Sequence, residues 1–121
     1  MFLKEAIENL TAKFKHAIAG VFGGIAHDRS LRIHYIIALL VIVVFYVLKV
    51  TFIEWALIFL GIGIVIGLEY LNSSIELLCD HVEEEYHDTI KKIKDFGAAA
   101  VFVSSIFVAL MGIVIIIQYI G

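Results

Sequence analysis

Residues 55–82 of the chain read WALIFLGIGIVIGLEYLNSSIELLCDHV, and this stretch decides the fold. The run from 55 to 68 carries no charge, and Glu69, Glu76 and Asp80 then follow among leucine, isoleucine and serine. A helical membrane span needs about 20 mostly apolar residues, so the stretch is long enough to cross a bilayer. An acidic residue at membrane depth is costly unless it is paired, hydrated or bound to metal. The three carboxylates therefore mark a candidate functional site.

The composition indicates that lipid, and not water, surrounds most of this chain. The 121 residues are 62% hydrophobic and the mean hydropathy is +1.02, which is more apolar surface than a soluble domain of this size hides. The sequence has no proline to stop or bend a helix. Its one cysteine, Cys79, excludes an internal disulfide and any CxxC metal or redox motif. With a net charge of −3 and no long basic block, nucleic acid is not an expected partner.

Three segments are expected to cross the membrane, at residues 33–50, 53–78 and 97–120. Helices are favoured because every backbone group in lipid must be satisfied internally, and the segments are too few and too long for a β-barrel. The sequence therefore predicts an all-α membrane protein of one domain, with a cytoplasmic loop at 79–96.

Residues 2–26 differ from the three apolar segments because they show one apolar face. Apolar side chains recur there every three or four positions, which predicts an amphipathic helix lying on the membrane surface. The alternative is a helix packed only on protein. The apolar positions are Leu3, Ile7, Leu10, Phe14, Ile18, Val21 and Ile25.

The basic residues predict the orientation of the chain in the membrane. Eight of the nine lysines and arginines lie before residue 33 or within 79–96, and only Lys49 lies between the first two spans. Short loops rich in lysine and arginine stay in the cytoplasm. The N-terminus and the 79–96 segment are therefore expected inside, and the C-terminus outside.

The acidic residues of the second span share one helical stripe. At about 100° per residue, Glu69, Asn72, Glu76 and Asp80 fall on one side of the helix at its cytoplasmic end. The same side of the membrane receives Asp28-Arg29, EEEYHD at 83–88 and IKKIKDFG at 90–97. Carboxylates suit Mg²⁺, which keeps waters and bridges phosphates, and lysine stabilises a transferring phosphoryl group. A carboxylate at headgroup depth orients or deprotonates a lipid hydroxyl. Phosphoryl transfer requires these parts, although spacing alone does not establish the reaction.

The combined motifs resemble the prokaryotic diacylglycerol kinase family, which includes undecaprenol kinases. They are Glu69-x-x-Asn72-x-x-x-Glu76-x-x-x-Asp80, then Glu85-Tyr86-His87, then Lys94-Asp95-x-Gly97-x-Ala99-Ala100, and the resemblance covers nearly the whole chain. It implies a homotrimeric enzyme of the bacterial cytoplasmic membrane that transfers the γ-phosphate of MgATP to a lipid alcohol. It also implies active sites at the cytoplasmic interface that neighbouring subunits share.

The resemblance implies roles for two groups of residues. On the lipid side, Glu69 would be the general base for the lipid hydroxyl, with Ala98 beside it or in a packing role. Glu76 would ligate the metal, together with Asp28 at a position where the family has Glu. The residues implied near the nucleotide are Glu76, Asp28, Glu85, Tyr86, His87, Lys94, Asp95 and His16. Asn72 and Asp80 would support the site, and an interfacial polar role is the alternative for His16.

More than one interpretation stays open for the acceptor lipid and for the class of function. The stretch KDFGAAAVF at 94–102 looks closer to the diacylglycerol branch, and RSLRIHY at 29–35 and FIEWALI at 52–58 look closer to the undecaprenol branch. Diacylglycerol is favoured and undecaprenol stays open. The two hypotheses from other classes are a small ion channel or transporter, in which carboxylates relay cations, and a membrane scaffold, in which they join helices.

Five further residues receive structural interpretations. His34 is interpreted as an interfacial polar residue rather than a ligand. Ser73 and Ser74 are expected to hydrogen-bond back to their own helix. Gly63 and Gly67 indicate close helix packing rather than a phosphate-binding loop, because they lie within a span.

Overall fold

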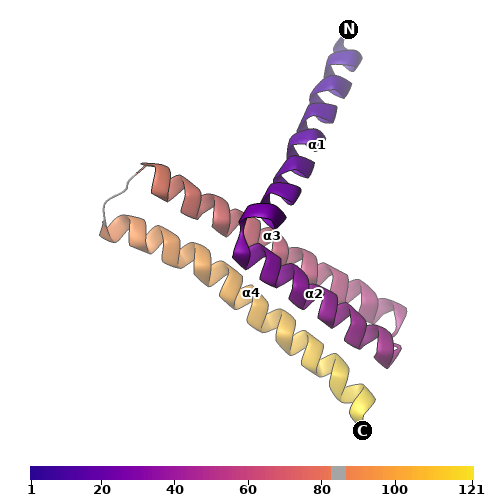
Figure 1. The fold of residues 1–121 in the computed structure, drawn as a ribbon. Helices are drawn as coiled ribbons and strands as arrows, with labels where there is room; N and C mark the ends of the chain where they lie inside the picture. The colour runs from indigo at the N-terminus through magenta and orange to yellow at the C-terminus, as the bar shows by residue number, and fades with distance from the viewer. Residues whose placement is uncertain (83–86) are drawn as a thin grey trace.

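The computed structural model describes residues 1–82 and 87–121 and holds four α-helices in these ranges. They are α1 (Phe2–His27), α2 (Arg29–Leu48), α3 (Phe52–Val82) and α4 (Asp88–Ile120). Helices α2, α3 and α4 are each long and apolar enough to cross a membrane. They lie side by side as a bundle, and α1 rises away from it at a steep angle (Figure 1). The expectation of an all-helical chain with three candidate spans is confirmed.

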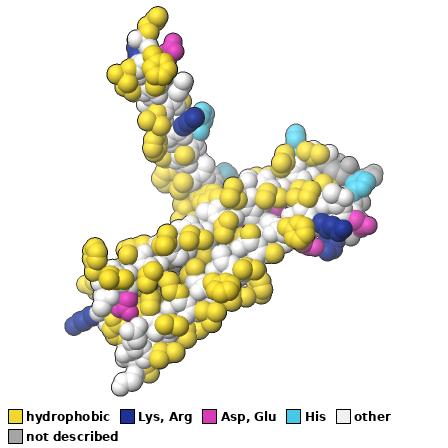
Figure 2. Space-filling model, turned by 180° about the vertical axis from the view of Figure 1, so that it is seen from behind, with side chains coloured by type: hydrophobic (Ala, Val, Ile, Leu, Met, Phe, Trp, Pro, Cys, Tyr) yellow, Lys and Arg dark blue, Asp and Glu magenta, His cyan; other side chains and the backbone are white. Residues whose placement is uncertain are grey.

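The surface of the bundle has the polarity pattern of a membrane protein. Hydrophobic side chains cover its middle, and charged side chains gather near its two ends (Figure 2). Helix α1 contributes no buried residue, and its apolar positions from Leu3 to Ile25 are exposed. Most apolar surface of this chain is therefore available to lipid or to another protein.

The helices extend further than the apolar segments of the sequence. Helix α2 starts at Arg29 instead of residue 33, α3 continues to Val82, and α4 starts at Asp88. Residues 79–82 and 88–96 of the expected cytoplasmic loop are therefore helical, and residues 83–86 lie outside the described residues. The physical reason is that hydropathy reports contact with lipid. Helical structure continues into water where no glycine or proline stops it.

Helix α3 lies at the centre of the bundle and is buried along one face. The buried positions recur every three or four residues, or at a multiple of that spacing, as one face of a helix requires. At Gly61 an added Cβ would lie 3.0 Å from Val108 Cγ1, so this glycine permits the close approach of α3 and α4. Among the described residues, no atom lies within 4 Å of such a Cβ at Gly63 or Gly67, so the close packing predicted there is not made within this chain. The buried residues of α3 are Glu54, Ile58, Gly61, Val65, Glu69, Asn72 and Cys79.

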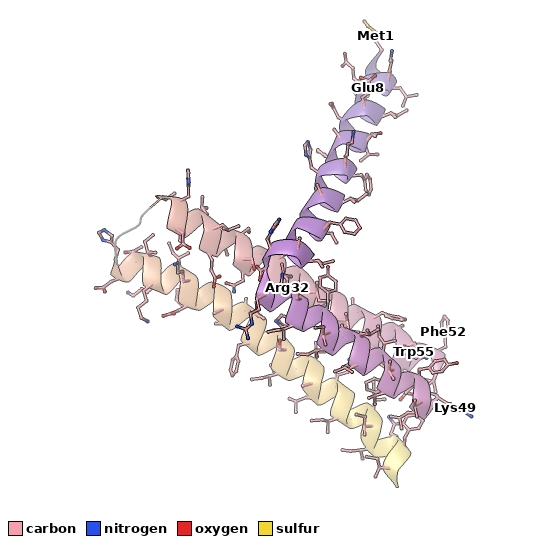
Figure 3. The ribbon with its side chains drawn as sticks, in the orientation of Figure 1. Met1, Glu8, Arg32, Lys49, Phe52 and Trp55 are labelled. Carbon is pink, nitrogen blue, oxygen red and sulfur yellow. The ribbon has the colours of Figure 1, made fainter. Side chains whose placement is uncertain are left out.

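The outer end of the bundle is closed by a buried carboxylate. Lys49 adopts a left-handed conformation (φ 57°, ψ 50°) that ends α2 and turns the chain into α3. The Glu54 carboxylate accepts hydrogen bonds from the Thr51 backbone N–H at 2.9 Å, from Gln118 Nε2 at 3.3 Å and from the Tyr119 hydroxyl. These contacts join the start of α3 to the end of α4. Lys49, Phe52 and Trp55 mark this end of the bundle, far from the α3–α4 connection (Figure 3).

Replacement of Glu54 by alanine is expected to lower the midpoint of thermal unfolding by several degrees. The substitution leaves the donors of Thr51, Gln118 and Tyr119 without their acceptor, and buried donors without partners are costly. Thermal unfolding of the protein in detergent micelles measures the effect. Glu8→Ala on exposed α1 is the control. An equal unfolding midpoint for both variants would contradict a stabilising role of the Glu54 hydrogen bonds.

Candidate active site

A polar cavity of about 390 Å³ lies where the start of α2 faces α3 and α4. We call it the polar cavity. Its lining includes five residues that the sequence predicts for the site, namely Asp28, Glu69, Asn72, Glu76 and Ala98. It also includes polar side chains for which the sequence predicts no catalytic role, namely Ser30, His34, Ser73 and Ser105. The fold therefore brings three carboxylates from two separate chain segments, Asp28 before α2 and Glu69 and Glu76 on α3, to one place.

Asp28 separates α1 from α2 and joins α2 to α3. Its extended backbone (φ −117°, ψ 111°) ends α1, and its Oδ1 accepts a hydrogen bond from the Leu31 N–H at 3.1 Å as the N-cap of α2. Its Oδ2 accepts a hydrogen bond from the Ser73 hydroxyl at 2.5 Å. The prediction that Ser73 bonds back to its own helix is therefore wrong, whereas Ser74 does so, to the Leu71 carbonyl at 2.8 Å. The sequence alone does not show that Asp28 lies beside α3, so it could not predict this contact with Ser73.

The surroundings of Asp28 favour its charged form. Burial raises the pKa of this carboxyl, but hydrogen bonds from Ser73 and from the backbone of Leu31 and Ser30 together hold the pKa below its ordinary value. Arg32 adds a smaller Coulombic contribution in the same direction. Asp28 lies outside the membrane-spanning helices. Because its pKa is lowered, its carboxyl is ionised at neutral pH and can bind a cation.

Glu69 is the most deeply buried carboxylate of the cavity, with 4% of its surface exposed. His34 Nε2 lies 3.4 Å from Glu69 Oε2. The interpretation of His34 as a merely interfacial residue missed this contact. The sequence did hold a signal for a polar helix face that includes His34. His34 follows Ser30 by four residues, so the two side chains share one face of α2.

A second contact beside Glu69 fixes the register of three helices. The Tyr35 and Tyr70 hydroxyls lie 2.8 Å apart, and the Tyr70 hydroxyl donates to the Val21 carbonyl of α1 at 2.9 Å. The absence of a side chain at Gly24 makes this possible, since an added Cβ would lie 2.5 Å from Tyr70 Cε1. Residues 34 and 69 are the chain neighbours of this tyrosine pair, so their side chains meet at a defined height in the bundle.

Asn72 lines the cavity and holds a buried acceptor atom without a partner. The residue is 8% exposed, and its Oδ1 has no hydrogen-bond partner within the described part of the chain. Gly97 of α4 lies directly against it, because an added Cβ there would be 2.5 Å from this oxygen. A buried polar atom without a partner calls for an explanation, and a donor group of a bound ligand supplies one.

The charged residues near the α3–α4 connection form two ion pairs outside the polar cavity. Lys94 Nζ donates to Asp80 Oδ1 at 2.6 Å, and Lys91 Nζ donates to Asp95 Oδ2 at 2.6 Å. Neither pair lines the cavity. The structure of one chain therefore does not bring Lys94, Asp95 or Asp80 together with Glu69.

The remaining predicted nucleotide residues are also separate from the polar cavity, or are not described. His16 lies on exposed α1, and His87 is the N-cap residue of α4. Glu85 and Tyr86 lie outside the described residues. The cavity thus gathers the residues predicted for the lipid and the metal, and none of the described residues predicted for the nucleotide alone.

The donor set of the cavity fits magnesium better than it fits a metal ion that protein side chains coordinate alone. Within residues 1–82 and 87–121, no three His, Cys, Asp or Glu side chains are grouped to hold a metal ion. Mg²⁺ is usually held by one or two carboxylates, with waters and substrate phosphates as the other ligands. Asp28 and Glu76 line the same cavity, and each oxygen of the Asp28 carboxylate keeps a second lone pair beyond its hydrogen bond.

The length of α2 locates the cavity relative to the hydrocarbon. Helix α2 has 20 residues, which at about 1.5 Å per residue gives roughly the 30 Å thickness of a bilayer core. The Asp28–Ser73 hydrogen bond marks the level of its start on α3. Glu69 lies about one helical turn to the apolar side of this level, and Glu76 lies about one turn beyond it. The cavity therefore lies at the end of the candidate spans where α2 begins.

Asp28→Asn is expected to destabilise the protein at pH 7, on the order of 5 °C in unfolding temperature, and to destabilise it less as the pH falls below about 4. Because the pKa of Asp28 is lowered by folding from an unfolded value of about 3.9, its ionised form stabilises the fold above that pH. This stabilisation is lost as the pH falls through the pKa of the folded state. Thermal unfolding of wild type and variant in micelles measures the difference at each pH. A difference that stays constant from pH 7 to pH 3 would contradict an ionic role.

Comparison with known proteins agrees with this arrangement of residues. Residues 15–116 match the family described as prokaryotic diacylglycerol kinase. The chain is 32% identical over 102 residues to the undecaprenol kinase of Bacillus subtilis, covering 84% of this chain and 83% of that protein. It is 34% identical over 105 residues to a Synechocystis diacylglycerol kinase, covering 86% and 60%. It is 27% identical over 111 residues to the diacylglycerol kinase of Haemophilus influenzae, covering 92% and 94%.

The match includes every residue that lines the polar cavity and most of the three candidate spans. With a family match over residues 15–116 and relatives above 30% identity over most of the chain, the protein belongs to the prokaryotic diacylglycerol kinase family.

Proposed function

We propose that this protein is an ATP-dependent lipid kinase that phosphorylates a membrane lipid alcohol at the cytoplasmic end of its helix bundle. Diacylglycerol is the favoured acceptor and undecaprenol is the alternative. The observation that carries the proposal is a carboxylate, Glu69, buried at the apolar edge of a cavity whose other end reaches the charged surface. A lipid hydroxyl and a nucleotide approach such a cavity from opposite sides. The channel, transporter and scaffold hypotheses give no account of the kinase family match and are not retained.

The chemical step follows from the position of Glu69. Its carboxylate accepts the hydroxyl proton while the lipid oxygen forms a bond to the γ-phosphorus of ATP. The bond from the γ-phosphorus to the bridging oxygen breaks, ADP leaves, and the proton passes from Glu69 to water. His34, at 3.4 Å, orients the carboxylate for this transfer. Asn72 offers its unpaired Oδ1 to a donor group of the bound substrates.

Two carboxylates are proposed to hold the nucleotide at the outer side of the cavity. Glu76 and Asp28 face the same space and would share one Mg²⁺ with the phosphates of ATP. When bound, the ion neutralises charge on the phosphates. Asp28 is fixed for this role by Leu31 and Ser73, whereas Glu76 is exposed and adjusts its side chain to the ligand.

The rest of the nucleotide site is proposed to come from residues that the sequence predicts near the nucleotide. Because the described ones among them, Lys94, Asp95, His87 and His16, do not line the cavity of their own chain, a neighbouring copy is proposed to complete the site in a homotrimer. The abundant exposed apolar surface of the bundle supports such an assembly. The residues are Lys94, Asp95, Glu85, Tyr86, His87 and His16, with Asp80 supporting Lys94 through their ion pair.

Helix α1 is proposed to lie on the cytoplasmic surface of the bacterial inner membrane. It leaves the bundle at Asp28, the level at which the hydrocarbon ends, and its apolar face is exposed. The N-terminus and the α3–α4 connection then lie in the cytoplasm, as eight of nine basic residues indicate. The active site faces the compartment that holds ATP.

Glu69→Gln is expected to lower lipid phosphorylation by at least about 100-fold, because the amide keeps the shape of the side chain but accepts no proton. The measurement is transfer of labelled γ-phosphate to diacylglycerol and undecaprenol, offered separately in mixed micelles. Glu54→Gln, at the other end of the same buried face, is the matched control and is expected to keep turnover. Full turnover by Glu69→Gln would contradict the base assignment. A wild-type protein that labels neither lipid would contradict the kinase itself.

Glu76→Gln is expected to raise the Mg²⁺ concentration for half-maximal activity by about tenfold or more, because a neutral amide is a weaker ligand for a hard cation. Titration of lipid phosphorylation with Mg²⁺ at fixed ATP measures this shift. Glu8→Gln on exposed α1 is the control. If Glu76→Gln lowered turnover at every Mg²⁺ concentration without a shift, its role would be other than metal binding.

A further inference from the structure

A second cavity continues from the polar cavity toward the outer end of the bundle. It has a volume of about 370 Å³ and is lined almost entirely by apolar residues of α2, α3 and α4. We call it the apolar cavity. It shares two lining residues with the polar cavity, His34 and Ser105. A lipid whose hydroxyl lies at Glu69 and whose hydrocarbon chain enters the apolar cavity must pass this junction.

Ser105 brings an unsatisfied hydroxyl to the junction. Its Oγ is buried and has no hydrogen-bond partner in the described part of the chain. A serine in a membrane helix ordinarily bonds back to its own helix. The neighbouring Ser104 does so, because its Oγ donates to the Ala100 carbonyl at 2.8 Å, with the Val101 carbonyl at 3.1 Å. The adjacent serines therefore differ in one respect, which is whether the hydroxyl is already used.

The position of this hydroxyl also argues for a ligand. Within residues 1–82 and 87–121, one other buried side-chain atom lacks a partner, Asn72 Oδ1, and it belongs to the same polar cavity. Buried polar atoms are ordinarily paired, so two exceptions on one cavity indicate partners that a substrate brings. Asn72 offers an acceptor, whereas Ser105 offers a donor.

The two candidate lipid alcohols differ at the group that reaches this donor. In diacylglycerol, the carbon next to the hydroxyl-bearing carbon holds an ester, and its carbonyl oxygen accepts hydrogen bonds. In undecaprenol, only hydrocarbon follows the hydroxyl-bearing carbon. A site with a polar partner for one substrate discriminates against the analogue that leaves this partner unpaired.

We propose that Ser105 is a specificity-determining residue that donates its hydroxyl to the ester carbonyl of a glycerolipid substrate. The inference rests on the proposed kinase function and names the substrate class of that site, a lipid alcohol with an ester beside the reacting hydroxyl. The alcohol lies in the polar cavity by Glu69, the ester lies at the junction by Ser105, and the acyl chain occupies the apolar cavity.

The test compares wild type with Ser105→Ala on three lipids: diacylglycerol, its ether analogue that lacks ester carbonyls, and undecaprenol. For diacylglycerol, the substitution is expected to lower kcat/KM about tenfold, the effect of one lost hydrogen bond. For the ether analogue and undecaprenol, kcat/KM is expected to stay unchanged. Ser104→Ala is the matched control and is expected to change none of the three values, because its hydroxyl bonds its own helix.

Two further variants keep the test decisive. Ser105→Thr keeps a hydroxyl and is expected to retain the preference for ester over ether, and Ser105→Cys replaces the alanine variant if that protein does not fold. An equal loss on all three lipids, or no loss on diacylglycerol, would overturn the specificity role while the kinase function stands. A wild-type protein that phosphorylates none of the three lipids would overturn the kinase function instead.

Discussion

The carboxylate of Asp28 makes the hydrogen bonds on which the end of the bundle where α1 meets α2 depends. No proline or glycine stands between His27 and Leu48, so nothing else in this part of the sequence stops one helix and starts the next. Asp28 caps α2 through Leu31 and holds α3 through Ser73. These two hydrogen bonds determine where α1 leaves the bundle and at which height α3 faces α2.

The height fixed by Asp28 determines what the neighbouring residues can do. Because Ser73 lies level with the start of α2, Glu69 falls on the apolar side of that level and Glu76 on the polar side. The Tyr35–Tyr70 hydrogen bond is a second contact that holds α2 against α3. The reaction proposed for this cavity requires a base in the lipid layer and metal ligands outside it. The break between α1 and α2 at Asp28 sets the level of the proposed base, Glu69, and of the proposed metal ligand, Glu76, relative to the start of α2.

Glu54 and Glu69 show why burial alone does not identify a catalytic carboxylate. Both lie on the buried face of α3, with 9% and 4% of their surface exposed. Glu54 accepts hydrogen bonds from a backbone N–H, an amide and a phenol, so its charge is compensated and it joins helices. Glu69 has one imidazole at 3.4 Å and an adjoining cavity. The free capacity of a buried carboxylate, and not its depth, indicates chemistry.

The sequence predicted those parts of the fold that depend on short-range periodicity and hydropathy. The three spans follow from long apolar runs, and the shared cavity lining of Glu69, Asn72 and Glu76 follows from the helical repeat. The role of His34 was missed because periodicity places a residue on a face without showing which helix that face meets. The partner of Ser73 lies 45 residues away and is invisible to local rules. The helical structure of 79–82 and 88–96 did not follow from the apolar runs, because hydropathy marks where lipid ends and not where a helix ends.

The separation of the two halves of the proposed site has a physical cause. Lys94 of α4 donates to Asp80 of α3, outside the polar cavity. The two residues lie opposite each other because α3 and α4 are consecutive, adjoining helices. A base and metal ligands that sit at the hydrocarbon boundary need surrounding walls, and one three-span bundle leaves most of its apolar side chains uncovered. In the proposed homotrimer, further copies would cover that surface and would bring charged residues of one chain opposite the cavity of the next. Assembly and completion of the site are therefore expected to be one event, driven by the same exposed surface.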